Sequence, residues 1–257
     1  MQLSEFVRML ESYAPLELAE SYDNIGLLIG TNREIRKVLV ALDCTTTVAR
    51  EAVSLGVDLV LTHHPLFFHP VQHILPDDPD TAAAFILLQN NIGMYAAHTN
   101  LDAADGGVND ALADALGLCR IRPIPDTAIG RLGEFPEAIS LRSFTKLCES
   151  RLSTRVHVCG DPDKTVRTVG VIGGAGAEFA EQLSPYCDVF VTGEMKHHEA
   201  IRMNELGIAC VVAGHYETES VIRKYWISRL QKQKNDVQYY ETSLERAPLT
   251  AQEEEYT

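Results

Sequence analysis

Short apolar runs alternate with stretches of helical periodicity along most of the chain. The apolar runs predict strands at 37–42, 57–62, 93–97, 166–172, 188–192, 209–213 and 236–240. Apolar residues recur at helical spacing over 46–55, 81–90 and 217–232. Strands separated by helices normally pair in parallel, because the crossover between them needs a dozen or more residues. The pattern therefore predicts an α/β fold with mixed, mainly parallel sheets.

A looser segment over 121–137 interrupts this alternation. It contains three prolines and two glycines, at Pro123, Pro125, Gly130, Gly133 and Pro136. Such residues favour turns and loops between periodic segments. We therefore predict a first α/β unit over 1–125 and a second over 126–225, with the C-terminal segment 226–250 packing on the first.

The two halves resemble each other. Residues 38–64 can be aligned with 169–194 with a one-residue gap. Later in each half, a short strand is followed by a histidine and then, four residues on, by a carboxylate: His98 and Asp102 in the first half, His215 and Glu219 in the second. These features predict that the two units are related by an internal repeat.

Polar side chains follow four of the predicted strands. They are His63 and His64, His98 with Asp102, Glu194, and His215 with Glu219. In open parallel sheets, ligands bind beyond the carboxyl ends of the strands. A helix that opens at 215 would put His215 and Glu219 on one face. If the four-residue offset instead spans a loop, the sequence does not fix their geometry.

This combination of side chains is typical of metal sites. Imidazole and carboxylate together suit divalent zinc, iron, manganese, cobalt or nickel. Carboxylates can also bridge two ions about 3.5–4 Å apart, and a water held between such ions becomes a nucleophile. A single histidine at a strand end is usually only a rim residue. The matched His and carboxylate pairs, however, favour a centre of two divalent metal ions per subunit.

The glycine-rich segment 170–176 follows a predicted strand and precedes a helix, so its amides could receive an anion. It lacks the spacing of a phosphate-binding loop. We interpret it as a tight strand-to-helix turn and leave anion binding at Gly173 to Gly176 open. Four basic residues are candidates for an anion-binding cluster elsewhere, namely Arg36, Lys37, Lys196 and Arg202.

Composition narrows the class of protein. A net charge of −14 argues against general nucleic-acid binding, which needs clustered lysine and arginine. The six cysteines form no C-x-x-C pair, which excludes a zinc knuckle or a thioredoxin-type motif. No stretch approaches the roughly 18 apolar residues of a membrane span, and the amino terminus lacks a signal sequence. We therefore expect a cytoplasmic protein with neither membrane nor nucleic-acid partners.

Five motifs, in order along residues 1–245, resemble those of the NIF-three-like (YbgI-like) dinuclear metal-centre proteins, whose members include the GTP cyclohydrolase 1 type 2 homologs. The matching segments are 22–27 (YDNIGL), 62–65 (THHP), 98–102 (HTNLD), 192–194 (TGE) and 214–219 (GHYETE). The resemblance implies a two-domain α/β subunit that assembles into a toroidal homohexamer with metal sites facing the inner cavity. The short join near 121–137 corresponds to the compact form, without the domain that some relatives insert between the halves.

The resemblance also assigns residues to roles. It implies five metal ligands, His63, His64, Asp102, His215 and Glu219. Among them, Asp102 and Glu219 would bridge the two ions. His98 and Glu194 would lie close by, either as catalytic groups that transfer protons or as groups that hold the ligands. Asp23 and Asn24 would shape a turn near the site.

Two classes of function fit these features. The first is a metal-dependent hydrolase that acts on a nucleotide or a phosphate-containing small molecule, as the name GTP cyclohydrolase suggests. The alternative is non-catalytic metal storage, delivery or insertion, with the ring as a scaffold. The sequence does not decide whether the protein is an enzyme.

Overall fold

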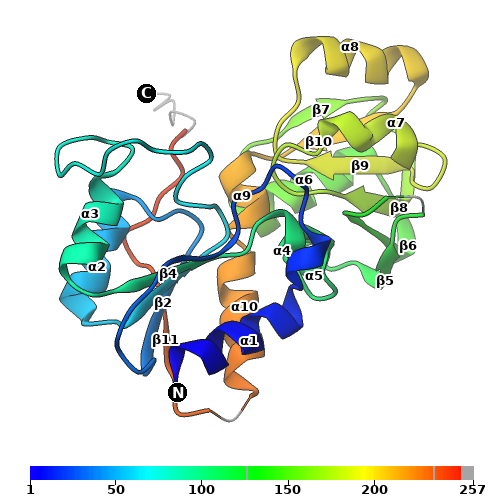
Figure 1. Cartoon of the computed structure of the whole chain (residues 1–257). Helices are drawn as coiled ribbons and strands as arrows, with labels where there is room; N and C mark the ends of the chain where they lie inside the picture. The colour runs from blue at the N-terminus through cyan, green and yellow to red at the C-terminus, as the bar shows by residue number, and fades with distance from the viewer. Residues whose placement is uncertain (126, 234, 250–257) are drawn as a thin grey trace, which may run out of the picture. The chain divides into compact units, whose positions relative to one another are not determined.

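The computed structural model describes residues 1–125, 127–233 and 235–249. The chain forms two compact units, each a sheet with helices on both faces (Figure 1). Of the described residues, the first unit comprises those of 1–107 and 222–245, and the second comprises those of 108–221 and 246–249. The predicted α/β fold with mixed sheets is confirmed.

The unit boundaries differ from the predicted ones at 125 and 225. The first lies earlier, because strand β5 (Cys119–Pro123) pairs with β6 (Arg131–Ser140) in the second sheet. Helix α5 (Val108–Ala115) also packs its apolar side in the second unit. The second boundary falls at 221/222, so the whole of helix α10 (Ile222–Gln231) belongs to the first unit.

Within the described residues, the first sheet has five strands in the order β1-β4-β3-β2-β11. Their bounds are β1 Gly26–Ile29, β2 Lys37–Ala41, β3 Leu59–Thr62, β4 Gly93–Ala96 and β11 Gln238–Glu241. Strands β4, β3, β2 and β11 are parallel, and β1 runs antiparallel to β4. The carboxyl ends of β2, β3 and β4 therefore meet at one edge.

The helices of the first unit are α1 (Leu3–Tyr13), the short η1 (Leu16–Leu18), α2 (Thr46–Leu55), α3 (Ala82–Gln89), α4 (Thr99–Ala103) and α10. Leu39, Val60 and Met94 are neighbours in register on one face of the sheet. They pack in one apolar core with α2 and α3. Helices α1 and α10 lie on the opposite side of this sheet (Figure 1). The buried runs seen in the sequence thus reflect strands covered on both faces.

The second sheet, again within the described residues, has six strands in the order β5-β6-β8-β9-β10-β7. The remaining bounds are β7 His157–Cys159, β8 Thr165–Val171, β9 Val189–Thr192 and β10 Ala209–Val212. Its parallel part is the centre, β8-β9-β10, and antiparallel pairs flank it on both sides. The central strands again end at a common edge.

The helices of the second unit cover both faces of its sheet. They are α5, α6 (Leu141–Leu152), η2 (Ala177–Phe179), α7 (Ala180–Leu183), α8 (His197–Leu206) and α9 (His215–Glu219). Helices α5 and α6 share one core with Val169, Val189 and Val211. Helices α7 and α8 pack with Phe190 and Cys210 in a second core. No helix in the described residues of either unit has the length and apolar character needed to cross a membrane.

Two predicted elements were wrong. The segment 121–137 is not a loose connection, since most of it lies in the hairpin of β5 and β6. Pro136 is tolerated within β6 because the pairing of β6 with β8 shifts register between Glu134 and Ile139. The long helix predicted over 217–232 is two helices, α9 and α10, separated at residues 220–221.

Matching hydrogen bonds confirm the internal repeat. The Asp58 carboxylate accepts from the amides of residues 36 and 37, at 2.9 and 3.0 Å, at the start of β2. The Asp188 carboxylate accepts from the amides of residues 167 and 168, at 2.9 and 2.8 Å, in β8. After the next strand, Ala97 donates to Thr62 and Ala213 donates to Thr192. The two βαβ segments therefore share the same hydrogen bonds at corresponding strand ends.

Candidate metal sites

Three histidines of the first unit converge at the carboxyl edge of its sheet. His63 and His64 directly follow β3, and His98 follows β4 and precedes α4. Their ring centroids lie 5.0 to 5.5 Å apart, and one nitrogen from each falls within 4.8 Å of the others. The parallel pairing of β3 with β4 produces this convergence, because Thr62 and Ala96 are register partners. The predicted gathering of these histidines is present.

The Nδ1 atom of each ring is held by an oxygen acceptor. His63 Nδ1 lies 2.8 Å from the Ala97 carbonyl oxygen and His64 Nδ1 lies 2.8 Å from Asp43 Oδ1. His98 Nδ1 lies 3.0 Å from Asp23 Oδ1. Because carbonyl and carboxylate oxygens only accept, Nδ1 carries the proton in each case and Nε2 keeps its lone pair. This tautomer is the one that binds a metal through Nε2.

Asp102 adds a carboxylate to these three rings. Helix α4 begins at Thr99, with His98 as its cap residue, so Asp102 lies one turn after His98. Its Oδ1 is 3.8 Å from His63 Nε2. The donor set is therefore three imidazoles and one carboxylate, which suits the borderline divalent ions. The residues fit a metal ion in both chemistry and tautomer.

Asp23 reaches this edge because β1 is antiparallel. The residue precedes β1, and the amino end of β1 pairs with the carboxyl end of β4. Burial alone would raise the pKa of the Asp23 carboxyl, but hydrogen bonds from His98 and Thr99 lower it to about 2. Asp23 is therefore a carboxylate that fixes His98, which is more than the turn-shaping role expected from the motif.

Asp43 is a site residue that the sequence reasoning missed. It lies two residues beyond the end of β2, at the same sheet edge as the histidines. The signal was available, since a carboxylate after a parallel strand is the pattern that identified the other candidates.

The second unit carries candidate ligands of its own at the corresponding edge of its sheet. His215 opens α9 as predicted, and its Nε2 is 3.0 Å from Glu219 Oε2. His215 Nδ1 is 3.0 Å from Oε1 of Glu194, which follows β9. The structure thus brings Glu194, His215 and Glu219 together, and two carboxylates flank one imidazole. Glu219 is buried, whereas the Glu194 side chain is 60% exposed.

The glycine-rich loop after β8 supports this second set and leaves little for an anion. Gly173 N donates to Asn109 Oδ1 at 2.9 Å, and Gly174 N donates to Thr218 Oγ1 at 3.1 Å. Gly176 N donates to Thr192 Oγ1 at 3.1 Å. These three amides already donate hydrogen bonds to side chains of the protein. The segment is therefore better described as a tight turn than as an anion-binding loop.

Close packing explains the glycines on either side of His215 and Glu219. A Cβ on Gly174 would lie 2.0 Å from Glu219 Oε1 and 3.2 Å from His215 Nε2. A Cβ on Gly193 would lie 2.7 Å from the Cα of His215. The two glycines therefore leave the space that the two candidate ligands occupy. A larger residue at either position would fill that space.

The basic residues considered for an anion site do not join the histidines of the first unit. Arg36 and Lys37 stand at the amino end of β2, the opposite edge of the sheet, and Arg36 pairs with Glu34 at 2.8 Å. In the second unit, Arg202 pairs with Glu181 at 2.8 Å. His197 and His198 are exposed on the first turn of α8.

Comparison with known proteins identifies the family. The model of the Duf34/NIF3 family (NGG1p interacting factor 3) matches residues 1–248. The chain belongs to this family. A Duf34/NIF3 relative from Streptomyces coelicolor, named GTP cyclohydrolase 1 type 2 homolog, is 36% identical over 234 residues, which are 85% of this chain and 81% of the relative. A relative of the same name from Methanocaldococcus jannaschii is 34% identical over 228 residues, covering 85% and 90%.

Solved structures of the Duf34/NIF3 family share the fold. A hypothetical protein from Staphylococcus aureus superposes with a TM-score of 0.93 at 27% identity, covering 98% of this chain and 99% of that one. Reduced HcgD from Methanocaldococcus jannaschii gives a TM-score of 0.81 at 32% identity, covering 95% and 98%. The family and fold inferred from the five sequence motifs are therefore confirmed, and the clustered histidines and carboxylates are candidate metal ligands.

Proposed function

We propose that the protein is a metal-dependent hydrolase with a dinuclear centre, acting on a nucleotide or another phosphate-containing small molecule. The observation that carries the proposal is the first-unit set, whose three imidazoles have Nδ1 tied and whose nitrogens converge next to a pocket. An enzyme needs such a pocket beside its reactive groups, whereas a storage site does not.

The five proposed ligands are those assigned from the sequence, His63, His64, Asp102, His215 and Glu219. Among them, His63, His64 and Asp102 belong to the first unit, and His215 and Glu219 belong to the second. Zinc, iron, manganese, cobalt or nickel bound there would acidify a water and stabilise developing negative charge.

His98 and Glu194 remain the proposed proton-transfer groups. Asp23 holds the His98 ring through Nδ1, so its Nε2 is the atom that can accept or return a proton. Glu194 lies 3.0 Å from His215 Nδ1 and is largely exposed, so it can exchange a proton with solvent. Asp43 orients His64 and keeps its Nε2 lone pair available.

The alternative is metal storage, delivery or insertion. One observation favours it: the side chains of His215 and Glu194 are 35% and 60% exposed, which would allow an ion to exchange. Under this reading, metal passes from the loaded protein to an apo-protein acceptor and no small molecule is consumed.

The metal assignment predicts a loss of bound metal in ligand variants from each unit. We expect His63→Ala and Glu219→Ala proteins, purified and loaded like the wild type, to lose most of their metal, because each removes one of the five proposed ligands. Mass spectrometric metal analysis measures the stoichiometry, and the exposed His198→Ala variant is the control. Wild-type stoichiometry in both ligand variants would contradict the assignment.

Hydrolysis is tested on fully loaded wild-type protein. We would incubate it with GTP and with a simple phosphoester, and chromatography would separate ring-opened and dephosphorylated products. Intact GTP and phosphoester at full metal occupancy would refute the hydrolase and leave the transfer function, which is then tested by following metal into an apo-protein.

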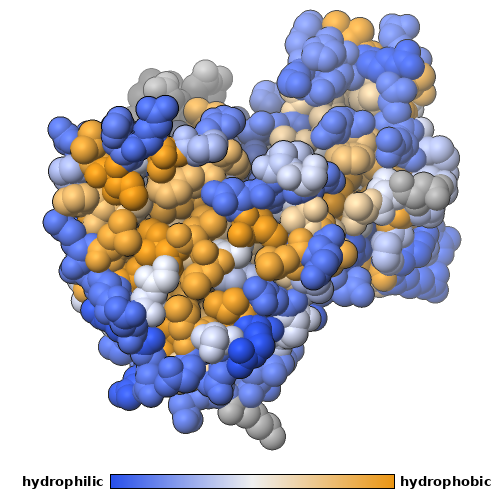
Figure 2. All heavy atoms as spheres, in the orientation of Figure 1, coloured by the Kyte–Doolittle hydropathy of each residue, from blue (hydrophilic) through white to orange (hydrophobic). Residues whose placement is uncertain are grey.

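We also propose that the chain assembles into a homohexamer. Figure 2 shows apolar side chains gathered on the visible face of the first unit. Among the exposed apolar residues of this unit are Leu16, Leu18 and Leu27. Leu27 lies on β1, which is an edge strand of the first sheet. Exposed apolar edges invite pairing with another chain unless they are covered, which supports burial of this surface in an oligomer.

A further inference from the structure

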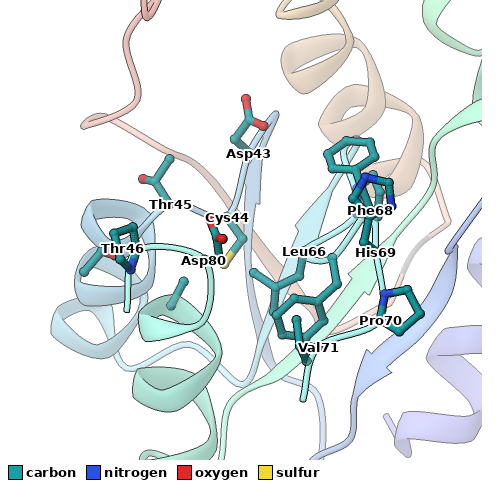
Figure 3. A pocket seen from close by; sticks show the side chains of 14 residues that line it. Asp43, Cys44, Thr45, Thr46, Leu66, Phe68, His69, Pro70, Val71 and Asp80 are labelled. Atoms are coloured by element: carbon teal, nitrogen blue, oxygen red, sulfur yellow. The ribbon is translucent and has the colours of Figure 1, made fainter. Parts of the chain in front are cut away.

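A pocket of about 460 Å³ lies within the first unit, next to the histidines. It extends from Asp43 along the start of α2 and is closed on the other side by the 65–71 loop and by Asp80 (Figure 3). Two residues connect it to the candidate metal ligands. Asp43 holds His64, and the Phe68 ring lies 6.3 Å from the His64 ring and 5.9 Å from the His98 ring between centroids. A molecule in this pocket would therefore lie beside the reactive groups.

The walls of the pocket differ in chemistry. Leu66, Pro70 and Val71 form an apolar side, whereas Thr45, Thr46 and Asp80 lie across from them (Figure 3). Phe68 is 60% exposed, so its ring is available for stacking. At the buried Cys44, burial and then the charges of Asp43 and Glu245 raise the pKa of the thiol to about 12, which leaves a neutral group there.

The polar groups of the pocket include two carboxylates and the imidazole of His69. Asp43 and Asp80 line it, and neither lysine nor arginine is among the described residues that do. A phosphate group would meet two carboxylates and, among the described lining residues, neither lysine nor arginine, which disfavours it. A group that donates N–H hydrogen bonds would instead find carboxylate and hydroxyl acceptors on one side and an apolar, aromatic surface on the other.

We propose that this pocket binds the planar, N–H-bearing heterocycle of the substrate, such as an aminated purine base, and that any phosphate of the substrate stays outside it. This inference rests on the proposed function in that it names the part of the substrate recognised beside the metal centre. Binding of the heterocycle requires no metal, since the apolar wall, the Phe68 ring and the polar side chains that would contact it involve no ion. The volume is in the range of small-molecule sites and exceeds the size of one base, so the sugar has room at the mouth.

The test is a binding titration with guanosine as the probe. Isothermal titration calorimetry is performed on full-length protein, both chelator-treated and metal-loaded. Ribose 5-phosphate and inorganic phosphate are titrated in parallel, because they carry the sugar and the phosphate without the heterocycle. We expect guanosine to bind both forms of the protein and the two phosphate probes to bind the metal-free form at least tenfold more weakly.

Variants connect the binding to this pocket. Phe68→Ala removes the stacking surface and should weaken guanosine binding about tenfold. Asp80→Asn removes an acceptor charge and should weaken it about fivefold or more, whereas Asp77→Asn, an equal charge change on an exposed residue of the same loop that does not line the pocket, should not. Val71→Trp fills the pocket and should abolish binding, and the exposed Leu88→Ala on α3 is the control for Phe68→Ala.

The outcomes separate this proposal from the proposed function. Metal-loaded protein that does not bind guanosine, or that binds it equally in the Val71→Trp variant, would overturn the pocket and leave the metal centre intact. Preferential binding of phosphate by metal-free protein would overturn it as well. Guanosine binding that depends on Phe68 and Asp80 in a protein without hydrolytic activity would support the pocket while refuting the hydrolase.

Discussion

Gly174 lies close against Glu219 in the second set of candidate ligands. The glycine has a φ of +60°, and a Cβ there would lie 2.0 Å from Glu219 Oε1. Glu219 can move away only by rotating its side chain, and that rotation would take its carboxylate from His215. The backbone at residue 174 therefore fixes the position of a candidate ligand.

A Gly174→Ala substitution should weaken metal binding more than it weakens folding. The left-handed conformation costs about 1–2 kcal/mol of unfolding free energy for alanine. The matched control is Gly207→Ala in the same unit, with a φ of +68° and nothing within 4 Å of the added Cβ. We expect similar thermal destabilisation of both variants, but a metal affinity about tenfold lower or more only for Gly174→Ala.

Equal metal affinities in the two variants would mean that the Gly174 contact does not position Glu219. Thermal unfolding followed by circular dichroism and a competitive titration against a chelator provide the two measurements.

At the level of single residues, the sequence pattern located the candidate ligands better than the groups that orient them. His63, His64 and His98 stand at the ends of apolar runs, where the pattern marks them directly. The contact of Asp23 with His98 could not be derived from the pattern, because β1 was not predicted and its antiparallel pairing brings that residue to the site. Local periodicity identifies strand ends, whereas the pairing of strands distant in sequence decides which polar groups meet.

The segment after β11 joins the C-terminal part of the first unit to the site. Glu245 Oε1 accepts from the amide of Asp43 at 2.6 Å, and Arg223 on α10 donates to Glu245 Oε2 at 2.6 Å. Glu51 on α2 accepts from the amide and hydroxyl of Ser243, at 2.9 and 2.7 Å, and from the Thr242 hydroxyl. Two buried carboxylates therefore fasten this segment beside the residue that orients His64.

Glu51→Gln should lower the stability of the protein and make it less dependent on pH. Burial alone would raise the pKa of Glu51, but hydrogen bonds from Thr242 and Ser243 lower it below its ordinary value. A carboxyl whose folded pKa is depressed contributes stability above its unfolded pKa, and this is lost as the pH falls through the folded pKa. We expect the variant to lose about 1–3 kcal/mol of unfolding free energy at pH 7 and less than this at acidic pH.

Urea unfolding at several pH values between 7 and 3 measures this difference. Glu17→Gln, which removes a charge from an exposed position on η1, is the control and should follow the wild type. A constant gap between Glu51→Gln and wild type across the whole range would show that the charge of Glu51 is irrelevant to folding.

Among the elements, most regular strands were predicted, whereas β1, β5 and β6, whose pairing shifts register, were not. Helix α2 spans 46–55 as the periodicity indicated, and β3, β4 and β10 agree within about two residues. Strand β6 escaped because its Pro136 and Gly133 are typical of loops in isolation. In the structure, Gly133 approaches Leu118, where a Cβ would lie 2.7 Å from the leucine Cβ, so tertiary packing decides this position.

At the scale of the whole chain, the repeated βαβ segments explain why each unit has one set of candidate ligands. In the first unit, two histidines follow β3, and a His and carboxylate pair stands at the start of α4, after the neighbouring parallel strand β4. In the second unit, a glutamate follows β9, and a His and carboxylate pair lies in α9, after the neighbouring parallel strand β10. The repeat is visible in the sequence because it includes side chains with chemistry. The boundary between the units was less visible, because helix α5 has an amphipathic pattern that would suit either sheet.

The exposed apolar residues of the first unit allow the proposed assembly of the chain to be tested. If Leu16, Leu18 and Leu27 are covered by other copies, light scattering coupled to gel filtration should give six times the chain mass of 28.4 kDa. Leu27→Asp would place a charge in the buried contact and should shift the mass towards smaller species. Leu206→Asp, an equal change at an exposed leucine of α8 in the second unit, should keep the wild-type mass. A wild-type mass of one chain would refute the hexamer, and dissociation by Leu206→Asp alone would move the interface to the second unit.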